Sequence, residues 1–165
     1  MRSIDADGDP SRRRVLAAVG VASGAALAGC LDDGGPEYEA GEVPDVDGDP
    51  RTAEEMTAAQ ALAEQEVRER VSPLADLVLT DHEFVLEDGY EGATVQGTVQ
   101  NDGDELVELV EVRVRVADAD DTLLGRYLDR TGDLAGGEAW AFTVVLLESP
   151  AEVADYDIAV LGTPT

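Results

Sequence analysis

The chain contains no lysine, a single cysteine and a single histidine. One cysteine excludes a disulfide bond within the chain, and one histidine excludes both a histidine cluster for a metal ion and a Ser-His-Asp triad. The histidine, His82, lies in a strand-like run between two acidic residues, and we expect it to be exposed. Among 37 acidic residues, pairs of carboxylates arise by chance and identify no glycosidase-type centre. We therefore expect no catalytic residues and no cofactor.

Basic residues are also scarce, since 11 arginines oppose 37 acidic residues and the net charge is -26. The first 29 residues hold four of the arginines and three aspartates, so the remainder carries 34 acidic and seven basic residues, a net charge of -27. This composition resembles that of haloarchaeal proteins, because in molar salt the screening length falls to about 3 Å and the repulsion weakens. A solvated carboxylate surface does not neutralise phosphates, so we expect no nucleic-acid partner.

Residues 11–30 follow the order of an export signal. Arg12 and Arg13 precede an apolar run, residues 15–28, which is shorter than the roughly 20 residues that a transmembrane helix needs. The sequence SRRRVL at residues 11–16 resembles the twin-arginine export consensus, with Val15 in place of the more usual aromatic residue. We expect residues 1–29 to be a signal peptide.

The export signal ends in Leu27, Ala28, Gly29 and Cys30, a sequence that resembles a lipobox. The resemblance implies cleavage before Cys30 and attachment of a lipid to its thiol. The alternatives are an ordinary signal peptide with an unrelated cysteine, or a buried free thiol. With Cys30 lipidated, the protein is exported and held on the outer face of the cell membrane.

Residues 30–51 are rich in glycine, proline and acidic residues, and we expect a flexible acidic tether. Its roughly 20 residues span on the order of 65 Å when fully extended. Residues 52–72 predict one helix, because Thr52 and Glu55 have the spacing of a capping box and strong helix formers follow. We also expect the helical pairs Glu64 with Arg68 and Glu66 with Arg70. The helix is a solvated spacer, a partner-binding helix, or an element docked on the next domain.

Residues 74–162 predict an all-β domain, because apolar residues alternate with polar ones between turn signals. In one run, four valines at 110, 112, 114 and 116 face a core, whereas Glu111, Arg113 and Arg115 face solvent. We expect hairpin turns at residues 101–104 and 118–121. The pattern favours an immunoglobulin-like antiparallel β-sandwich of six or seven strands. The expected strands are residues 76–87, 93–101, 106–118, 122–130, 138–147 and 154–161.

Several short runs resemble the FxLYD-type domain, a small β-sandwich of secreted archaeal and bacterial lipoproteins. They are VQGTVQNDG at residues 95–103, the valine-rich run, GGE at 136–138, AWAF at 139–142 and YDI at 156–158. The resemblance covers roughly residues 74–162 and implies a fold, without a catalytic residue to carry over.

Two aromatic residues are candidates for contacts with a partner. Tyr90 lies in a turn-like, glycine-containing segment and is the candidate for an exposed contact, whereas alternation places Trp140 in the core. Residues 45–49 resemble part of a calcium loop, but Gly48 is fourth rather than sixth and Met56 is twelfth, so we expect no dedicated metal site.

Two functions remain. One is a non-catalytic binding or accessory module, held at the membrane by the lipid on Cys30, with an envelope protein or transporter as partner. The other is a structural spacer of the cell envelope without a specific ligand.

Overall fold

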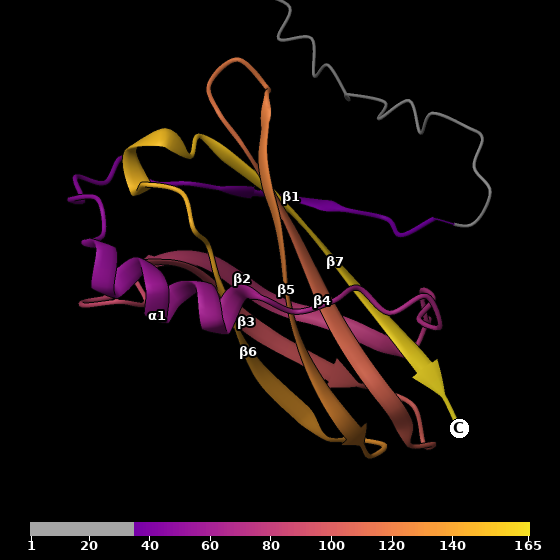
Figure 1. Ribbon diagram of the computed structural model, residues 1–165. Helices are drawn as coiled ribbons and strands as arrows, with labels where there is room; N and C mark the ends of the chain where they lie inside the picture. The colour runs from indigo at the N-terminus through magenta and orange to yellow at the C-terminus, as the bar shows by residue number, and fades with distance from the viewer. Residues whose placement is uncertain (1–34) are drawn as a thin grey trace, which may run out of the picture. The chain divides into compact units, whose positions relative to one another are not determined.

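Two antiparallel β-sheets face each other in the computed structural model, which describes residues 35–165. One sheet has four strands in the order β1-β7-β4-β5, and the other has three in the order β2-β3-β6 (Figure 1). This arrangement confirms the predicted all-β sandwich. The elements are β1 (Glu39–Glu42), α1 (Ala53–Ala63), β2 (Leu77–Leu86), β3 (Ala93–Asn101), β4 (Val107–Ala117), β5 (Leu123–Leu134), β6 (Ala139–Val145), the 3-10 helix η1 (Pro150–Glu152) and β7 (Asp155–Pro164).

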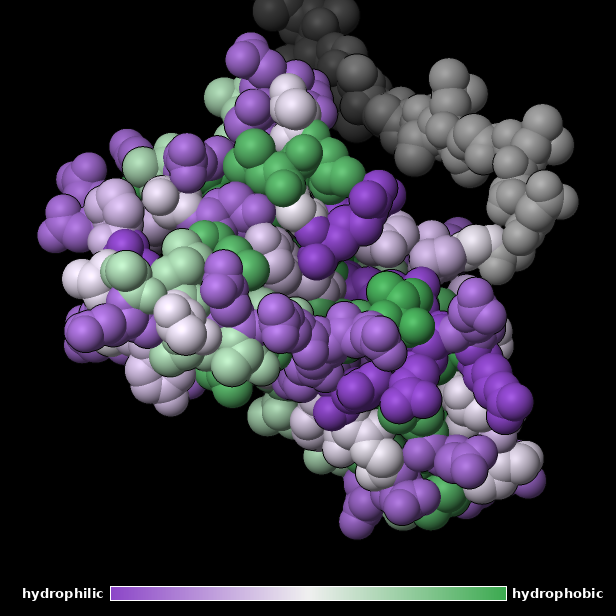
Figure 2. Space-filling view, viewed as in Figure 1, coloured by the Kyte–Doolittle hydropathy of each residue, from purple (hydrophilic) through white to green (hydrophobic). Residues whose placement is uncertain are grey.

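The predicted export signal and lipobox lie outside the described residues, because Arg12, Arg13, Leu27, Ala28, Gly29 and Cys30 all precede residue 35. From residue 35 to residue 165, no helix has the length and apolar character needed to cross a bilayer. Hydrophilic side chains cover most of the face shown in Figure 2, as the acidic composition leads one to expect.

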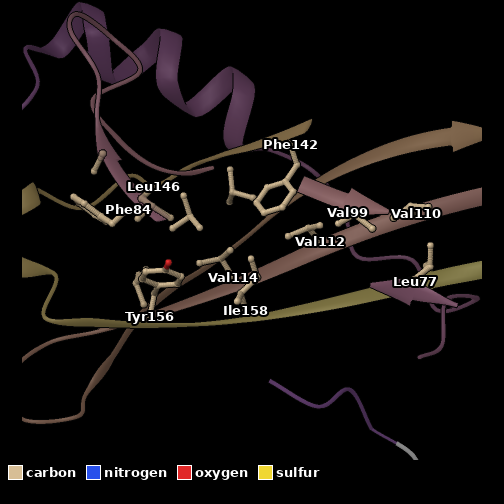
Figure 3. Close-up of a cluster of buried hydrophobic side chains, with 14 of the residues drawn as sticks. Leu77, Phe84, Val99, Val110, Val112, Val114, Phe142, Leu146, Tyr156 and Ile158 are labelled. Atoms are coloured by element: carbon tan, nitrogen blue, oxygen red, sulfur yellow. The ribbon is translucent and has the colours of Figure 1, made fainter. Parts of the chain in front are cut away.

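The core lies between the two sheets and follows the predicted alternation. The four valines of β4 at positions 110, 112, 114 and 116 have no exposed surface. Phe84 and Phe142 from the three-stranded sheet pack with them, as do Tyr156 and Ile158 of β7 (Figure 3). Burying one side chain of this kind stabilises the fold by about 1.5–3 kcal/mol relative to leaving it exposed. The six predicted strands are all present, and β5 extends four residues beyond its predicted end.

The prediction of a flexible tether over residues 30–51 was wrong in its second half. Residues 39–42 form β1 and pair with β7, with Glu39 opposite Ile158 and Glu42 opposite Asp155. Gly41 permits this pairing, since a Cβ built at that position would overlap the ring of Tyr156. Two later residues of the segment, Val43 and Val46, pack against the core. Apolar contacts that acidic composition does not reveal therefore hold this segment on the sandwich.

The helix begins as predicted and ends early. Thr52 caps α1, and Thr52 and Glu55 form the expected capping box. The helix ends at Ala63 instead of residue 72, so the two predicted helical ion pairs do not form. It lies against β6 and buries Ala59, so the helix is docked on the domain and is not a solvated spacer.

The chain after α1, residues 64–72, crosses the outer face of the four-stranded sheet as an extended segment that we call the strap. Its hydrogen bonds go to the sheet instead of to a helix: Gln65 Nε2 donates to the Leu128 carbonyl at 3.3 Å, and Ser72 forms a bridge with Gly162. Arg113 donates to the carbonyl of Arg68 at 3.0 Å. Tertiary hydrogen bonds thus outweigh the helix propensity of these residues.

The strap also buries Glu111, which was predicted to face solvent. Glu111 has no exposed surface, and its Oε1 accepts a hydrogen bond from Arg113 Nε at 2.6 Å. The backbone N–H of Arg68 lies 3.4 Å from Glu111 Oε2. Alternation places Glu111 correctly on the outer face, but it does not show that another segment covers that face.

One of the two predicted hairpin turns is present. Residues 118–121 connect the paired strands β4 and β5, and the Asp118 carboxylate accepts hydrogen bonds from the backbone N–H groups of Thr122 and Asp120. These bonds hold the pKa of Asp118 below its usual range.

Residues 101–104 instead connect strands of different sheets, since β3 pairs with β2 and β6 and not with β4. Asn101 is buried there, and its amide nitrogen donates to the carbonyls of Glu105 at 2.8 Å and Leu134 at 3.0 Å. These bonds fix the crossover between the sheets.

Candidate binding site

A pocket of about 400 Å³ lies at one end of the sandwich, and we call it the loop-end pocket. Three segments that are distant in the sequence surround it: residues 48–52 before α1, residues 86–92 at the end of β2 and in the β2–β3 loop, and residues 147–150 after β6. Loops gathered at one end of a rigid sandwich are a common place for recognition.

Arg51 joins two of these segments. Its Nε donates to the carbonyl of Tyr90 at 2.8 Å, and its Nη2 donates to the carbonyl of Glu91. Gly92 adopts a φ of 57°, and a Cβ on it would approach the guanidinium to 2.8 Å, so glycine leaves room for the arginine. Burial lowers the pKa of Arg51, while Tyr127, Glu148 and Glu55 act in the opposite direction. Arg51 thus holds the β2–β3 loop in one position.

Glu148 lines the pocket from the third segment. Its Oε1 accepts a hydrogen bond from the hydroxyl of Tyr127 at 2.7 Å. Its Oε2 is buried and has no hydrogen-bond partner within residues 35–165. The pKa of Tyr127 lies above its usual range, first because of burial and then because of the hydrogen bond to Glu148. Gly125 is needed beneath this pair, since a Cβ there would contact both side chains.

The charged residues that line the loop-end pocket are mostly acidic. Five of the lining residues are acidic against one arginine, and they are Asp49, Glu55, Glu87, Asp88 and Glu148. The pKa of Glu55 is lowered by hydrogen bonds from Thr52, its backbone N–H first. Leu86, which lines the pocket, is 38% exposed, and Tyr90 in the adjoining loop is 46% exposed. An exposed apolar side chain beside fixed polar groups is suited to binding.

The polar side chains of this pocket bond mainly to other groups of the protein. Within the described part of the chain, no group of three or more histidine, cysteine, aspartate or glutamate residues is placed to hold a metal ion. Arg51 is engaged with backbone carbonyls, and Glu148 with a tyrosine of raised pKa. The polar groups therefore fix the shape of the pocket and its charge.

His82 lies elsewhere, and the expectation that it is exposed was wrong. Its side chain is 18% exposed, and its Nδ1 lies 2.7 Å from the hydroxyl of Tyr156 on the facing sheet. The two rings meet edge to face, with centroids 5.6 Å apart. Burial, followed by the charge of Glu83, raises the pKa of Tyr156 to about 12. His82 is thus part of the packing between the sheets and beneath β1.

The predicted contact residue Tyr90 is exposed in the β2–β3 loop, of which Gly89 and Gly92 line the candidate pocket and Tyr90 itself does not. Trp140 is half-buried against the core, with its ring centroid 5.9 Å from that of Phe142. Sequence analysis did not identify Arg51, Tyr127 and Glu148, which are brought together only by the fold. The local signal available was the position of Arg51 directly before the helix cap.

Comparison with known proteins adds one relative and no family. The chain is 28% identical over 137 residues to an uncharacterized protein of Methanocaldococcus jannaschii, and the aligned region covers 82% of each protein. No family model matches the chain, so its resemblance to the FxLYD-type domain stays a prediction. No solved structure matches it either.

Proposed function

We propose that this protein is an exported lipoprotein whose β-sandwich is a non-catalytic binding module on the outer face of the cell membrane. The sequence supports anchoring through Cys30, because a sequence that resembles a twin-arginine signal is followed by a lipobox-like sequence that ends in Cys30. The acidic composition supports the inference that the protein works at high salt concentration. The remaining support is the position of the loop-end pocket relative to the point where the chain enters the sandwich.

The chain enters the sandwich at the end opposite to the loop-end pocket, and this observation carries the proposal. Glu37 and Glu39 lie beside Leu77, the first residue of β2, where they line one cavity. Leu86, the last residue of β2, lines the loop-end pocket. A strand of ten residues spans roughly 30 Å. In Figure 1, β1 accordingly runs from the right side of the view toward α1 on the left.

The anchor is short because β1 begins only nine residues after Cys30. Nine residues span at most about 30 Å, which is less than half of the reach expected for a fully flexible tether. A lipid on Cys30 therefore keeps the entry end of the sandwich close to the membrane. The loop-end pocket, which Leu86 lines, and the adjoining loop with Tyr90 are then turned away from the membrane, where a partner can reach them.

Two experiments test the two parts of the proposal separately. For anchoring, membranes are separated from the medium after expression of the wild type, of Cys30→Ser, and of a variant with Arg12→Lys and Arg13→Lys. We expect Cys30→Ser to be exported and to leave the membrane, and the double variant to stay inside the cell. Cys30→Ser that remains in the membrane fraction contradicts lipid anchoring.

For binding, a photo-crosslinking residue is placed at Tyr90 or, as a control, at Val78, which is 36% exposed near the entry end of β2. Crosslinking is carried out on intact cells. We expect a discrete product from position 90 and none from position 78. Identical results at both positions contradict a specific binding end, and the absence of products at both favours a spacer without a ligand.

A further inference from the structure

A second surface lies on the outer face of the four-stranded sheet, on the part that the strap leaves uncovered. The register places Ala40 of β1, Asp157 of β7, Arg115 of β4 and Arg126 of β5 in one row across all four strands. Residues in such a row share one face of the sheet. We call these four residues the cross-strand row.

Arginine is concentrated on this face of a very acidic protein. Seven arginines follow residue 29, and six of them lie in the strap or on the outer face of β4 and β5. Four of the six lie on the sheet, and two of these four contact the strap or its buried glutamate: Arg113 pairs with Glu111, and Arg130 donates to the carbonyl of Glu66 at 3.4 Å. The six arginines are Arg68, Arg70, Arg113, Arg115, Arg126 and Arg130.

The two arginines of the cross-strand row differ in their partners. Arg115 is held in place, because its Nη2 donates to Asp157 at 2.8 Å and its guanidinium stacks 3.6 Å from the centre of the Tyr38 ring. Arg126 is exposed, and among the described residues it has neither an ion pair nor a hydrogen bond from its side chain. Like charges directly opposite each other destabilise a sheet, so a negative group between them would be stabilising.

The surroundings of Arg126 combine apolar surface with negative charge. The row borders a groove of about 540 Å³ that also contains Leu123, Ala117 and two further aspartates, Asp121 and Asp155. Leu123 and its neighbour Leu124 are 42% and 36% exposed. Figure 2 shows a hydrophobic patch over the part of the β4–β5 hairpin that is close to its turn. The groove thus offers a guanidinium beside apolar side chains.

We propose that this groove binds an apolar group that ends in a single carboxylate, with Arg126 as the main contact. A guanidinium donates two parallel hydrogen bonds to a carboxylate, and Arg115 adds positive charge from a fixed position. Three aspartates around the groove disfavour a doubly charged phosphate more than a singly charged carboxylate. Salt screens the attraction between charges, so the contact of the apolar group with Leu123 has to contribute to affinity. This site is separate from the loop-end pocket and does not depend on the proposed lipid anchor.

The test uses N-acetyl-leucine as the probe and N-acetyl-leucinamide as its uncharged match. Each is titrated into the full-length chain in high-salt buffer, and the Nε–Hε signal of Arg126 and the methyl signals of Leu123 and Leu124 are followed by NMR. We expect N-acetyl-leucine to shift these signals in a saturable way and the amide to leave them unchanged. Hexanoate is a third probe, an apolar carboxylate that is not a peptide end. Binding of N-acetyl-leucine without binding of hexanoate identifies a peptide C-terminus as the ligand, and binding of both compounds identifies apolar carboxylates in general.

Two matched variants complete the test. Arg126→Gln should weaken the binding of N-acetyl-leucine about tenfold, because it removes the charged hydrogen bonds. Arg130→Gln, a change of the same kind on the same strand, should leave the affinity unchanged. The remaining signals show that each variant is folded. Equal shifts with the acid and the amide, the absence of saturable shifts with both carboxylates, or unchanged affinity in Arg126→Gln overturns the proposal.

Discussion

The buried ion pair between Glu111 and Arg113 provides a direct test of how the strap stabilises the sandwich. Glu111 is completely buried, and its carboxylate lies 2.6 Å from Arg113 Nε. Arg113→Met leaves the negative charge without its partner in a place that water does not reach. Arg115→Met is the matched control, because Arg115 lies on the same face two residues later and pairs with Asp157, with side chains 37% and 44% exposed.

The expected losses of unfolding free energy differ severalfold between the two variants. Breaking a buried pair by removing one partner costs about 3–5 kcal/mol, and we expect about 3 kcal/mol for Arg113→Met because Arg113 itself is 20% exposed. An exposed pair contributes about 0–1 kcal/mol, which sets the expectation for Arg115→Met. In a protein of this size, a loss of 3 kcal/mol lowers the midpoint of thermal unfolding by roughly 6–12 °C.

The assay is unfolding in urea at constant high salt, followed by the fluorescence of Trp140, the single tryptophan. The double variant Glu111→Leu with Arg113→Met separates charge from packing, since it removes both charges. It should be more stable than Arg113→Met alone. The reasoning fails if Arg113→Met costs no more free energy of unfolding than Arg115→Met, or if the double variant is the less stable of the two.

Three further predictions concern single positions. Asn101→Ala removes an amide that satisfies two backbone carbonyls at the crossover between the sheets, so urea unfolding should show a loss of about 1–3 kcal/mol; a loss near zero contradicts this role. Gly97→Ala should abolish the cooperative thermal transition seen by circular dichroism, because the new Cβ would overlap a backbone carbonyl of β2. Gly132→Ala is the control and should fold normally, because the nearest atom to its new Cβ is 3.6 Å away. Equal melting of the two variants contradicts the close approach of Gly97 to β2. Backbone N–H groups in the hairpin turn lower the pKa of Asp118, so the stabilisation from its carboxylate should be present above the ordinary carboxyl pKa and disappear as the pH falls through the lowered pKa. An NMR titration of the Asp118 carboxyl carbon should therefore have a lower midpoint in the folded chain than in the urea-unfolded chain. An equal or higher midpoint in the folded chain would refute this.

Much of the sandwich was predictable from the sequence because its strands are half-buried and therefore alternate. The valines of β4 and the start of α1 at Thr52 followed from local patterns that physical chemistry explains directly. Two features depended on contacts between distant segments. The end of α1 at Ala63 results from hydrogen bonds between the strap and the sheet, and β1 is only four residues long, too short for its alternation to stand out among acidic residues.

The candidate site was predictable only in part, for the same reason. Tyr90 could be identified as an exposed aromatic residue because glycines surround it in a turn. Arg51, Tyr127 and Glu148 belong to three distant segments, and no spacing links them in the sequence. Their proximity arises from the way the sheets stack, which alternation alone does not define.

The position of β1 determines how tension reaches the sandwich. A pull on the chain before Glu39 acts along the strand, and the hydrogen bonds between β1 and β7 run across that direction. All four pairs of residues are then strained together instead of opening one after another. The ring of Tyr156 beneath Gly41 and the stacking of Tyr38 on Arg115 oppose the same sliding movement. Force on the chain is thereby shared with β7 and the whole sheet, so the edge strand is not peeled away.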